Sequence, residues 1–324
     1  MPQTLGASGG GADISSSDSG LKGEFDRLFE PIRRRRDRAE ELVDAVPRGR
    51  LYVALCSVGL SSPEFTLVPD CVLLRRITNP PSFLDVMSAG RPGSVDSLAI
   101  GRDAQEITGE LVLNGPEGDS DPDFLLDLAF HAAVLLRLRC ASSTYAPAAA
   151  DVSWDTVAAH DGDVRFVGLD EPASRVTASA HDFPVNQVDA EWVSASFVPA
   201  LRLRDFEHSR RFGLAFNIAY AWNHSSDPRL AIANIWVGLE ALFGDQGDRP
   251  VTRNLVRRIS EWNGCDADEV TGLYNVRCDA VHGRWVETAD LAAPIDAAWQ
   301  LLRQSLVRAI DVEDVPLPDW GAGV

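Results

Sequence analysis

The segment LYNVRCDAVHG, residues 273–283, carries two side chains suited to anion binding and proton transfer. A helix with a 3.6-residue period over 267–282 places Arg277 on its apolar stripe. The same helix places His282 on its last turn, directly before Gly283, a residue that often ends helices. A guanidinium binds phosphate through directed hydrogen bonds, and an imidazole exchanges protons near neutral pH. The spacing therefore indicates a site that could bind a phosphate and move a proton.

Each of these two residues also has a purely structural interpretation. A guanidinium on a buried stripe needs a partner, because a lone buried charge costs several kcal/mol. Glu240 lies at the edge of the apolar stripe of a helix expected over 228–243, so an Arg277–Glu240 pair across two antiparallel helices would satisfy both groups. His282 could simply complement the C-terminal carbonyls of its helix, an effect of ~0.3–1 kcal/mol. Both interpretations stay open at this stage.

The sequence contains little that indicates a metal site or a nucleotide-binding site. Cys265, Cys278 and His282 have a spacing that matches no compact zinc site, and a fourth ligand is missing. The chain contains neither a Walker motif nor a Gly-x-Gly-x-x-Gly sequence. We therefore expect no metal ion and no cofactor.

Long helical patterns must position the candidate residues, because from about residue 189 the strand signals end and 3.6-residue periods take over. Helices are expected at 189–203 (interrupted near Pro199), 205–223, 228–243, 251–262, 267–282 and 293–310. Turn-forming segments separate them, which predicts an all-α antiparallel bundle over 189–311. The tail 312–324 is acidic and contains Pro and Gly, so we expect it to be flexible.

The preceding part of the chain has a mixed pattern. Short β-branched runs predict strands at 50–58, 65–77, 97–101, 107–115 and 164–169, and helices are expected at 23–45 and 122–140. These elements predict an α+β domain over 22–188. They do not define its role; a sensor or regulatory role, with a regulatory ligand or protein bound, is an expectation from the domain order and from analogy alone. The Gly- and Ser-rich residues 1–21 predict a disordered tail.

Composition narrows the class of protein. The chain of 324 residues has a net charge of −18, which argues against a general nucleic-acid-coating protein. Its five scattered cysteines, without a Cys-x-x-Cys motif, are typical of reduced thiols in the cytoplasm. The most apolar stretch, 124–136, contains Asp127 and His131, so it predicts a buried helix rather than a membrane span, and no secretory signal is visible.

Two segments of the helical part resemble a known family. The string Arg277-Cys278-Asp279-Ala280-Val281-His282 is an R-x4-H motif, flanked by Leu273, Tyr274 and Gly283. It resembles the last signature of HEPN domains, especially the Apea-like HEPN group. The segment WVGLEALFG, residues 236–244, resembles an earlier helix of the same group. The resemblance covers about residues 205–310, a third of the chain.

This resemblance implies a metal-independent endoribonuclease of the defence or toxin type, in which Arg and His of two protomers meet at a homodimer interface. It implies that His282 is the acid or base, that Arg277 binds the scissile phosphate, and that Glu240 orients Arg277. Asp279 would orient His282 or Arg284. Further expected RNA contacts are Arg284, Arg253, Arg257 and Arg258.

Many catalytic members of that group carry Asn, Asp, His or Ser directly after the arginine, whereas this chain has Cys278. A cysteine is a poorer hydrogen-bonding group. The alternative function is therefore a catalytically inactive module for dimerisation and binding. In that case the Arg277–Glu240 pair would be purely structural.

Overall fold

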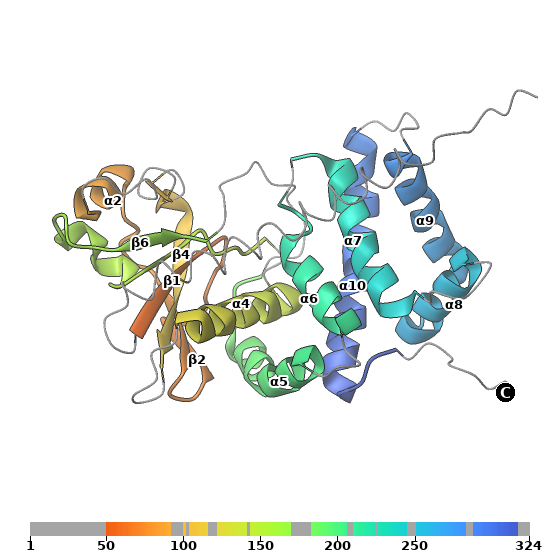
Figure 1. Ribbon diagram of the computed structural model, residues 1–324, viewed down its shortest axis with the longest axis horizontal. Coiled ribbons are helices and arrows are strands. Elements are labelled where there is room, and N and C mark those ends of the chain that lie inside the picture. The colour runs from red at the N-terminus through yellow and green to blue at the C-terminus, as the bar shows by residue number, and fades with distance from the viewer. Residues whose placement is uncertain are drawn as a thin grey trace, which may run out of the picture.

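The computed structural model describes residues 50–91, 100–101, 104–115, 122–140, 143–169, 183–205, 210–224, 226–244, 251–282 and 288–316. The predicted tail 1–21, the predicted helix 23–45 and residues 317–324 of the predicted C-terminal tail lie outside this part. The described residues form an antiparallel sheet in the N-terminal part and a helical C-terminal region (Figure 1). This arrangement agrees with the predicted order, an α+β part followed by helices.

The sheet contains six described strands in the order β2-β3-β4-β1-β5-β6, and every neighbouring pair is antiparallel. Their bounds are β1 Arg50–Cys56, β2 Glu64–Val68, β3 Val72–Arg76, β4 Ile107–Asn114, β5 Ala148–Ala150 and β6 Phe166–Gly168. The strands predicted at 50–58, 107–115 and 164–169 are confirmed. The run 65–77 is two strands, because the chain turns at Asp70, which has a positive φ of 60°.

The strand predicted at 97–101 is wrong at its described residues, since Ile100 and Gly101 are helical. A short apolar run has no periodicity that separates a strand from a buried helical turn. This turn packs closely on an aromatic ring, since a Cβ on Gly101 would lie 2.7 Å from Cδ2 of Phe83. That ring belongs to α2 (Phe83–Ala89), a helix that begins with a capping box formed by Ser82 and Asp85.

The helical region follows the predicted pattern closely. Its elements are α5 Gln187–Asp205, α6 Arg210–Ala221, α7 Pro228–Phe243, α8 Val251–Asn263, α9 Ala267–Val281 and α10 Ala292–Val312. Helix α4 Pro122–Arg139, predicted in the α+β part, lies between β4 and β5 in the chain. The expected interruption of α5 near Pro199 is wrong, because the helix continues through it. Phe197 and Ala200 on either side are both buried, so packing holds the two halves in one helix.

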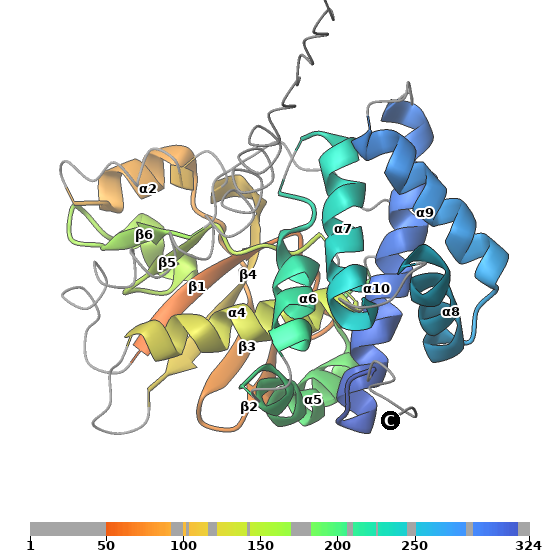
Figure 2. The ribbon, with the colours of Figure 1, turned by 45° about the vertical axis from the view of Figure 1, so that its right-hand side comes forward.

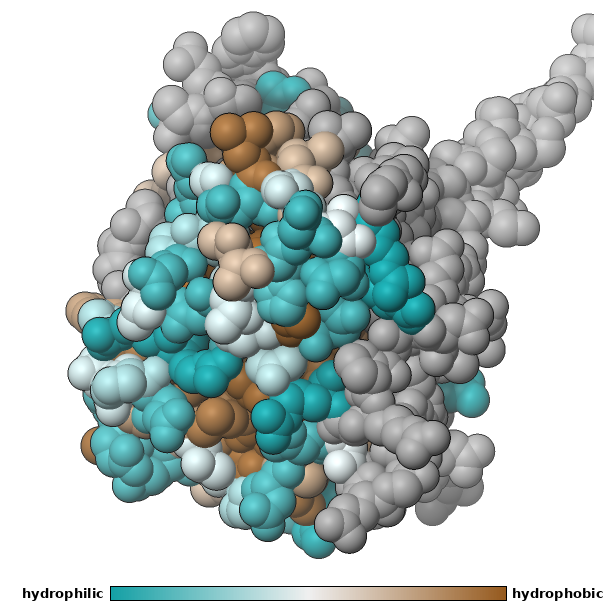
Figure 3. All heavy atoms as spheres, turned by 90° about the vertical axis from the view of Figure 1, so that its left-hand side faces the viewer, coloured by the Kyte–Doolittle hydropathy of each residue, from teal (hydrophilic) through white to brown (hydrophobic). Residues whose placement is uncertain are grey.

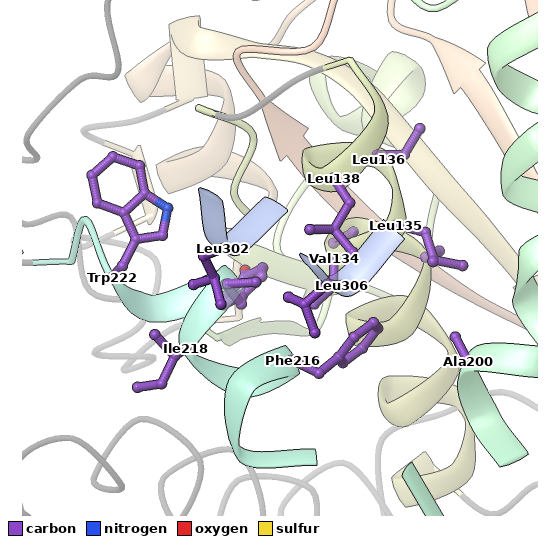
Figure 4. Close-up of a cluster of buried hydrophobic side chains, with 14 of the residues drawn as sticks. Val134, Leu135, Leu136, Leu138, Ala200, Phe216, Ile218, Trp222, Leu302 and Leu306 are labelled. Carbon is purple, nitrogen blue, oxygen red and sulfur yellow. The ribbon is translucent and has the colours of Figure 1, made fainter. Parts of the chain in front are cut away.

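A continuous buried cluster joins the sheet to the helices. It includes Leu51 on β1, Val134 on α4, Phe216 on α6 and Leu306 on α10. Figure 4 shows the side chains of α4, α5, α6 and α10 that meet in this cluster. A second cluster on the opposite face of the sheet contains Trp154 and is covered by α2 and the 3-10 helix Trp154–Ala159. The helical region is therefore packed directly on one face of the sheet.

Helices α8 and α9 lie at the end of the molecule that is farthest from the sheet, beyond α7 and α10 (Figure 2). Helix α7 approaches α6 and α10 closely at Gly238. A Cβ there would lie 3.0 Å from Cδ2 of Leu302 and 3.1 Å from Cγ2 of Ile218. This approach fixes α7, and with it the position of Glu240 two residues later.

The surface at the sheet end of the molecule carries both hydrophobic and hydrophilic side chains. The face in Figure 3 carries hydrophobic side chains in small groups that hydrophilic ones separate. Such scattered groups are ordinary on protein surfaces. This face therefore offers no broad apolar area among its coloured residues.

Candidate functional site

Helix α9 has well-defined ends. Its N-cap is Asp266, whose side chain accepts a hydrogen bond of 2.8 Å from the amide of Asp268. Acidic residues in the first turn favour the positive end of the helix dipole. At the other end, the amide of His282 donates to the carbonyl of Cys278 at 2.9 Å. The histidine therefore closes the helix, as the sequence predicted.

Helix α7 supplies the surface against which α9 packs. Asp227 caps its N-terminus, with Pro228 in the first turn. The buried side of α7 includes Ile232, Ile235, Trp236, Leu239, Leu242 and Phe243. Glu240 lies at the edge of this side, half-buried, and faces α9.

The predicted contact between Arg277 and Glu240 is present. An Nη2–Oε1 distance of 3.2 Å joins them, with 19% of the Arg277 side chain and 36% of the Glu240 side chain exposed. Burial raises the pKa of the Glu240 carboxyl above its usual range, and the positive charge of Arg277 acts in the opposite direction. The pair is therefore partly desolvated without being sealed from water.

An aromatic support for Arg277 was missed at the sequence level. The guanidinium carbon lies 5.8 Å from the centre of the Tyr274 ring. Tyr274 in turn meets Trp236 edge-on, with 5.2 Å between ring centres. The sequence could have predicted this contact, because Tyr274 and Arg277 are three residues apart and such residues are neighbours on a helix. One carboxylate and one aromatic ring thus hold the guanidinium in place.

The buried Nε of Arg277 has no hydrogen-bond partner in the part of the chain that the structure describes. A guanidinium has five N–H donors, so its contact with Glu240 leaves donor capacity unused. Such capacity suits binding of a further acceptor, for example a phosphate oxygen, after a small movement of the side chain.

His282 and Arg277 lie on different sides of α9. Five residues of α-helix correspond to ~140° of rotation and ~7.5 Å along the axis. Arg277 shares the inward face with Val270 and Ala280, which are buried, whereas His282 is exposed. The structure therefore places an accessible imidazole and a fixed guanidinium on the last turns of one helix, ~140° apart around its axis.

One residue of the predicted stripe departs from expectation. The helical period over 267–282 also predicts Val281 on the apolar stripe, but Val281 is 46% exposed, and Ala280 takes the inward place instead. Because α9 is nearing its C-terminal end at this point, fewer neighbours cover its last turn. The apolar Val281 therefore lies on the surface directly beside His282.

The remaining predicted site residues are dispersed. Asp279 is half-buried on α9, and Arg253 is exposed on α8. Arg257 forms an ion pair of 2.9 Å with Glu261 one turn later. Arg258 donates a hydrogen bond of 3.2 Å to the carbonyl of Phe243 and so helps to end α7. Arg284 lies outside the described residues. Arg253 and Arg257 are thus predicted RNA-contacting arginines with exposed positions on α8.

No family model, no curated protein and no solved structure matches this chain. Among the described residues, no group of three or more His, Cys, Asp or Glu side chains has an arrangement that could hold a metal ion. In the same part of the chain, no helix has both the length and the apolar character to cross a membrane.

Proposed function

We propose that the helical region is a HEPN-like domain and that the chain is a metal-independent endoribonuclease of the defence or toxin type. One observation carries this proposal: at the end of α9, a guanidinium held by Glu240 and Tyr274 accompanies an exposed histidine. RNA cleavage through its own 2′-hydroxyl needs a group that moves protons and a cation on the scissile phosphate. The two residues supply these functions.

In the proposed reaction the 2′-oxygen attacks the phosphorus atom and loses its proton to a base. The bond from phosphorus to the 5′-oxygen breaks, and that oxygen takes up a proton as it leaves, so that a 2′,3′-cyclic phosphate and a 5′-hydroxyl form. His282 acts as the base or the acid, a contribution of ~10²–10⁴ in rate. Arg277 stabilises the charge that builds on the phosphate oxygens, and Glu240 and Tyr274 keep it oriented.

The sheet is proposed to regulate the helical region. The continuous buried cluster supports this role, since it links β1 to α10 through α4. Val134→Ala would loosen this cluster far from α9. A changed cleavage rate in a variant that still folds would support coupling between the two parts, and an unchanged rate would count against it.

A second candidate function is a non-catalytic dimerisation and binding module. The observation in its favour is that Glu240 already neutralises Arg277, as a purely structural pair would require. In this case the wild-type protein would associate with itself or bind RNA without cutting it.

Cleavage of RNA by the purified full-length chain in the presence of EDTA separates the two candidates. We expect the wild type to produce cyclic phosphate ends, and His282→Ala and Arg277→Ala each to lower the rate at least about 100-fold. Matched controls are His160→Ala, a histidine paired with Asp163 in the sheet region, and Arg202→Ala, an arginine of α5 paired with Glu313. If all five proteins have the same rate while circular dichroism shows them folded, the nuclease proposal fails.

A further inference from the structure

Helix α5 presents one side to the interior and another to solvent. The interior side is buried at Val193, Phe197 and Ala200. On the opposite side lies an exposed outer face formed by Glu191, Ala195, Val198 and Arg202. Their spacing of four, three and four residues keeps them within ~60° around the helix axis. Because α5 continues through Pro199, they form one row of ~17 Å.

The outer face is complementary to a second copy of itself. The midpoint between Glu191 and Arg202 is also the midpoint between Ala195 and Val198. An antiparallel copy of α5 centred there therefore places Glu191 opposite Arg202 at both ends of the row. At the centre, the small Ala195 lies opposite the larger Val198. A two-fold symmetric interface requires such a self-complementary surface, with opposite charges and matching sizes across it.

The two charged groups are available for such a contact. The Arg202 side chain is 63% exposed, and it lies 3.5 Å from a Glu313 side chain that is itself 56% exposed. Glu191 accepts a hydrogen bond of 3.0 Å from Gln187 one turn earlier, and both residues are exposed. Exposed contacts of this kind contribute little stability. Arg202 and Glu191 can therefore take up further partners without a large loss.

Apolar side chains accompany the charges on a helix that is already fixed. Val198 is 52% exposed, and Val188, almost one turn before Glu191 on the same side of α5, is 62% exposed. A second α5 would remove both from water, which favours association. The indole Nε1 of Trp192 donates to Asp311 of α10 at 3.2 Å and so helps to hold α5 in place. A helix that is held in this way loses little freedom on docking.

We propose that the outer face of α5 is a self-association surface, on which a second copy of the chain packs its own α5 in the antiparallel direction. The contact is small, so we expect a weak dimer that forms at high protein concentration and that salt weakens. Its location separates it from the candidate site, since α5 packs beside β2 at the sheet and α9 lies at the far end of the molecule (Figures 1 and 2). The inference is therefore independent of the proposed function, and RNA cleavage does not require this contact.

Charge reversal followed by rescue tests the antiparallel pairing. Glu191→Arg places arginines opposite each other at both ends of the row, and Arg202→Glu does the same with carboxylates. Each single variant should raise the dissociation constant at least about 10-fold in sedimentation measurements over a range of concentrations. The double variant Glu191→Arg/Arg202→Glu restores opposite charges in its own dimer and should associate like the wild type. An equimolar mixture of the two single variants restores them between unlike copies and should recover association as well.

Matched controls are Glu261→Arg and Arg257→Glu, because these residues form an exposed ion pair on α8 and the changes in net charge are the same. We expect both controls to associate like the wild type, and circular dichroism to show every variant folded. The inference is overturned if the wild type stays monomeric up to roughly 1 mM. It is equally overturned if the single variants associate like the wild type, if the controls weaken association as much as they do, or if the double variant and the mixture fail to recover it.

Discussion

A buried histidine in α4 leads to a quantitative prediction about acid stability. The ring of His131 is fully buried, with 4.9 Å between its centre and that of Phe197 and 4.8 Å to that of Phe216. Neither ring nitrogen has a hydrogen-bond partner in the described part of the chain. Burial, together with the smaller effect of the Arg204 charge, lowers the pKa of His131 to about 3, and the backbone of Phe197 acts weakly in the opposite direction. The folded protein therefore holds this imidazole neutral.

The direction in which pH changes the free energy of unfolding follows from the pKa of His131 in the folded and the unfolded protein. The unfolded chain protonates His131 near pH 6.5, whereas the folded chain does so near pH 3. Between these values the unfolded state binds more protons, so the free energy of unfolding falls as the pH falls. Each pH unit corresponds to ~1.36 kcal/mol, which amounts to about 2 kcal/mol at pH 5. Above pH 6.5 the residue has no such effect.

Substitution by His131→Leu removes the titrating group and keeps an apolar side chain in the cluster. Urea denaturation at pH 7 and at pH 5 should show that the wild type loses about 2 kcal/mol more stability than the variant over this interval. All other titrating groups are common to the two proteins and cancel in the comparison. A control, His160→Leu, retains His131 and should keep the acid sensitivity of the wild type. If the wild type and His131→Leu lose equal stability between pH 7 and pH 5, the assignment of a neutral buried imidazole is incorrect.

Three further predictions concern the helices of the candidate site. Arg277→Ala should lower the free energy of unfolding by roughly 2–3 kcal/mol because it leaves Glu240 unpaired, whereas His282→Ala should cost little; equal thermal melts would contradict this difference. Gly272→Ala should stabilise the protein by about 0.5–1 kcal/mol, because a Cβ added to this mid-helix glycine would meet no atom within 4 Å, and an unchanged denaturation midpoint would count against it. Gly238→Ala should destabilise by about 1–3 kcal/mol through contact with α6 and α10, which a raised midpoint would disprove.

Local sequence signals were sufficient for the long helices of the C-terminal part, apart from the continuation of α5 through Pro199, but they missed α2. The 3.6-residue period and the Asp227-Pro228 start located α7, and the predicted bounds of the other helices are correct to within a few residues, apart from the later start of α6 at Arg210. The Arg277–Glu240 contact could also be predicted, because a charge on an apolar stripe requires a partner on the facing helix. The helix predictions depend only on residues close in sequence. The predicted ion pair depends only on the free-energy cost of burying an unpaired charge.

Long-range packing decided what the sequence left open. Strand β5 consists of three alanines without a β-branched signal, and it is a strand because β1 and β6 pair with it on either side. Residues 100–101 are helical and pack closely on Phe83 of α2, a contact that the sequence pattern does not reveal. Propensity is weak in such short segments, so hydrogen bonds and contacts from distant parts of the chain determine the outcome.

Local patterns predicted the long helices and identified Arg277 and His282, because periodicity and capping act over a few residues. Only the tertiary structure decided where these residues point. Packing of α9 on α7 draws Arg277 inward to Glu240 and Tyr274, and it leaves His282 on the outer surface. The physical reason is that a helix has one buried face, and five residues of α-helix carry a side chain ~140° away from it.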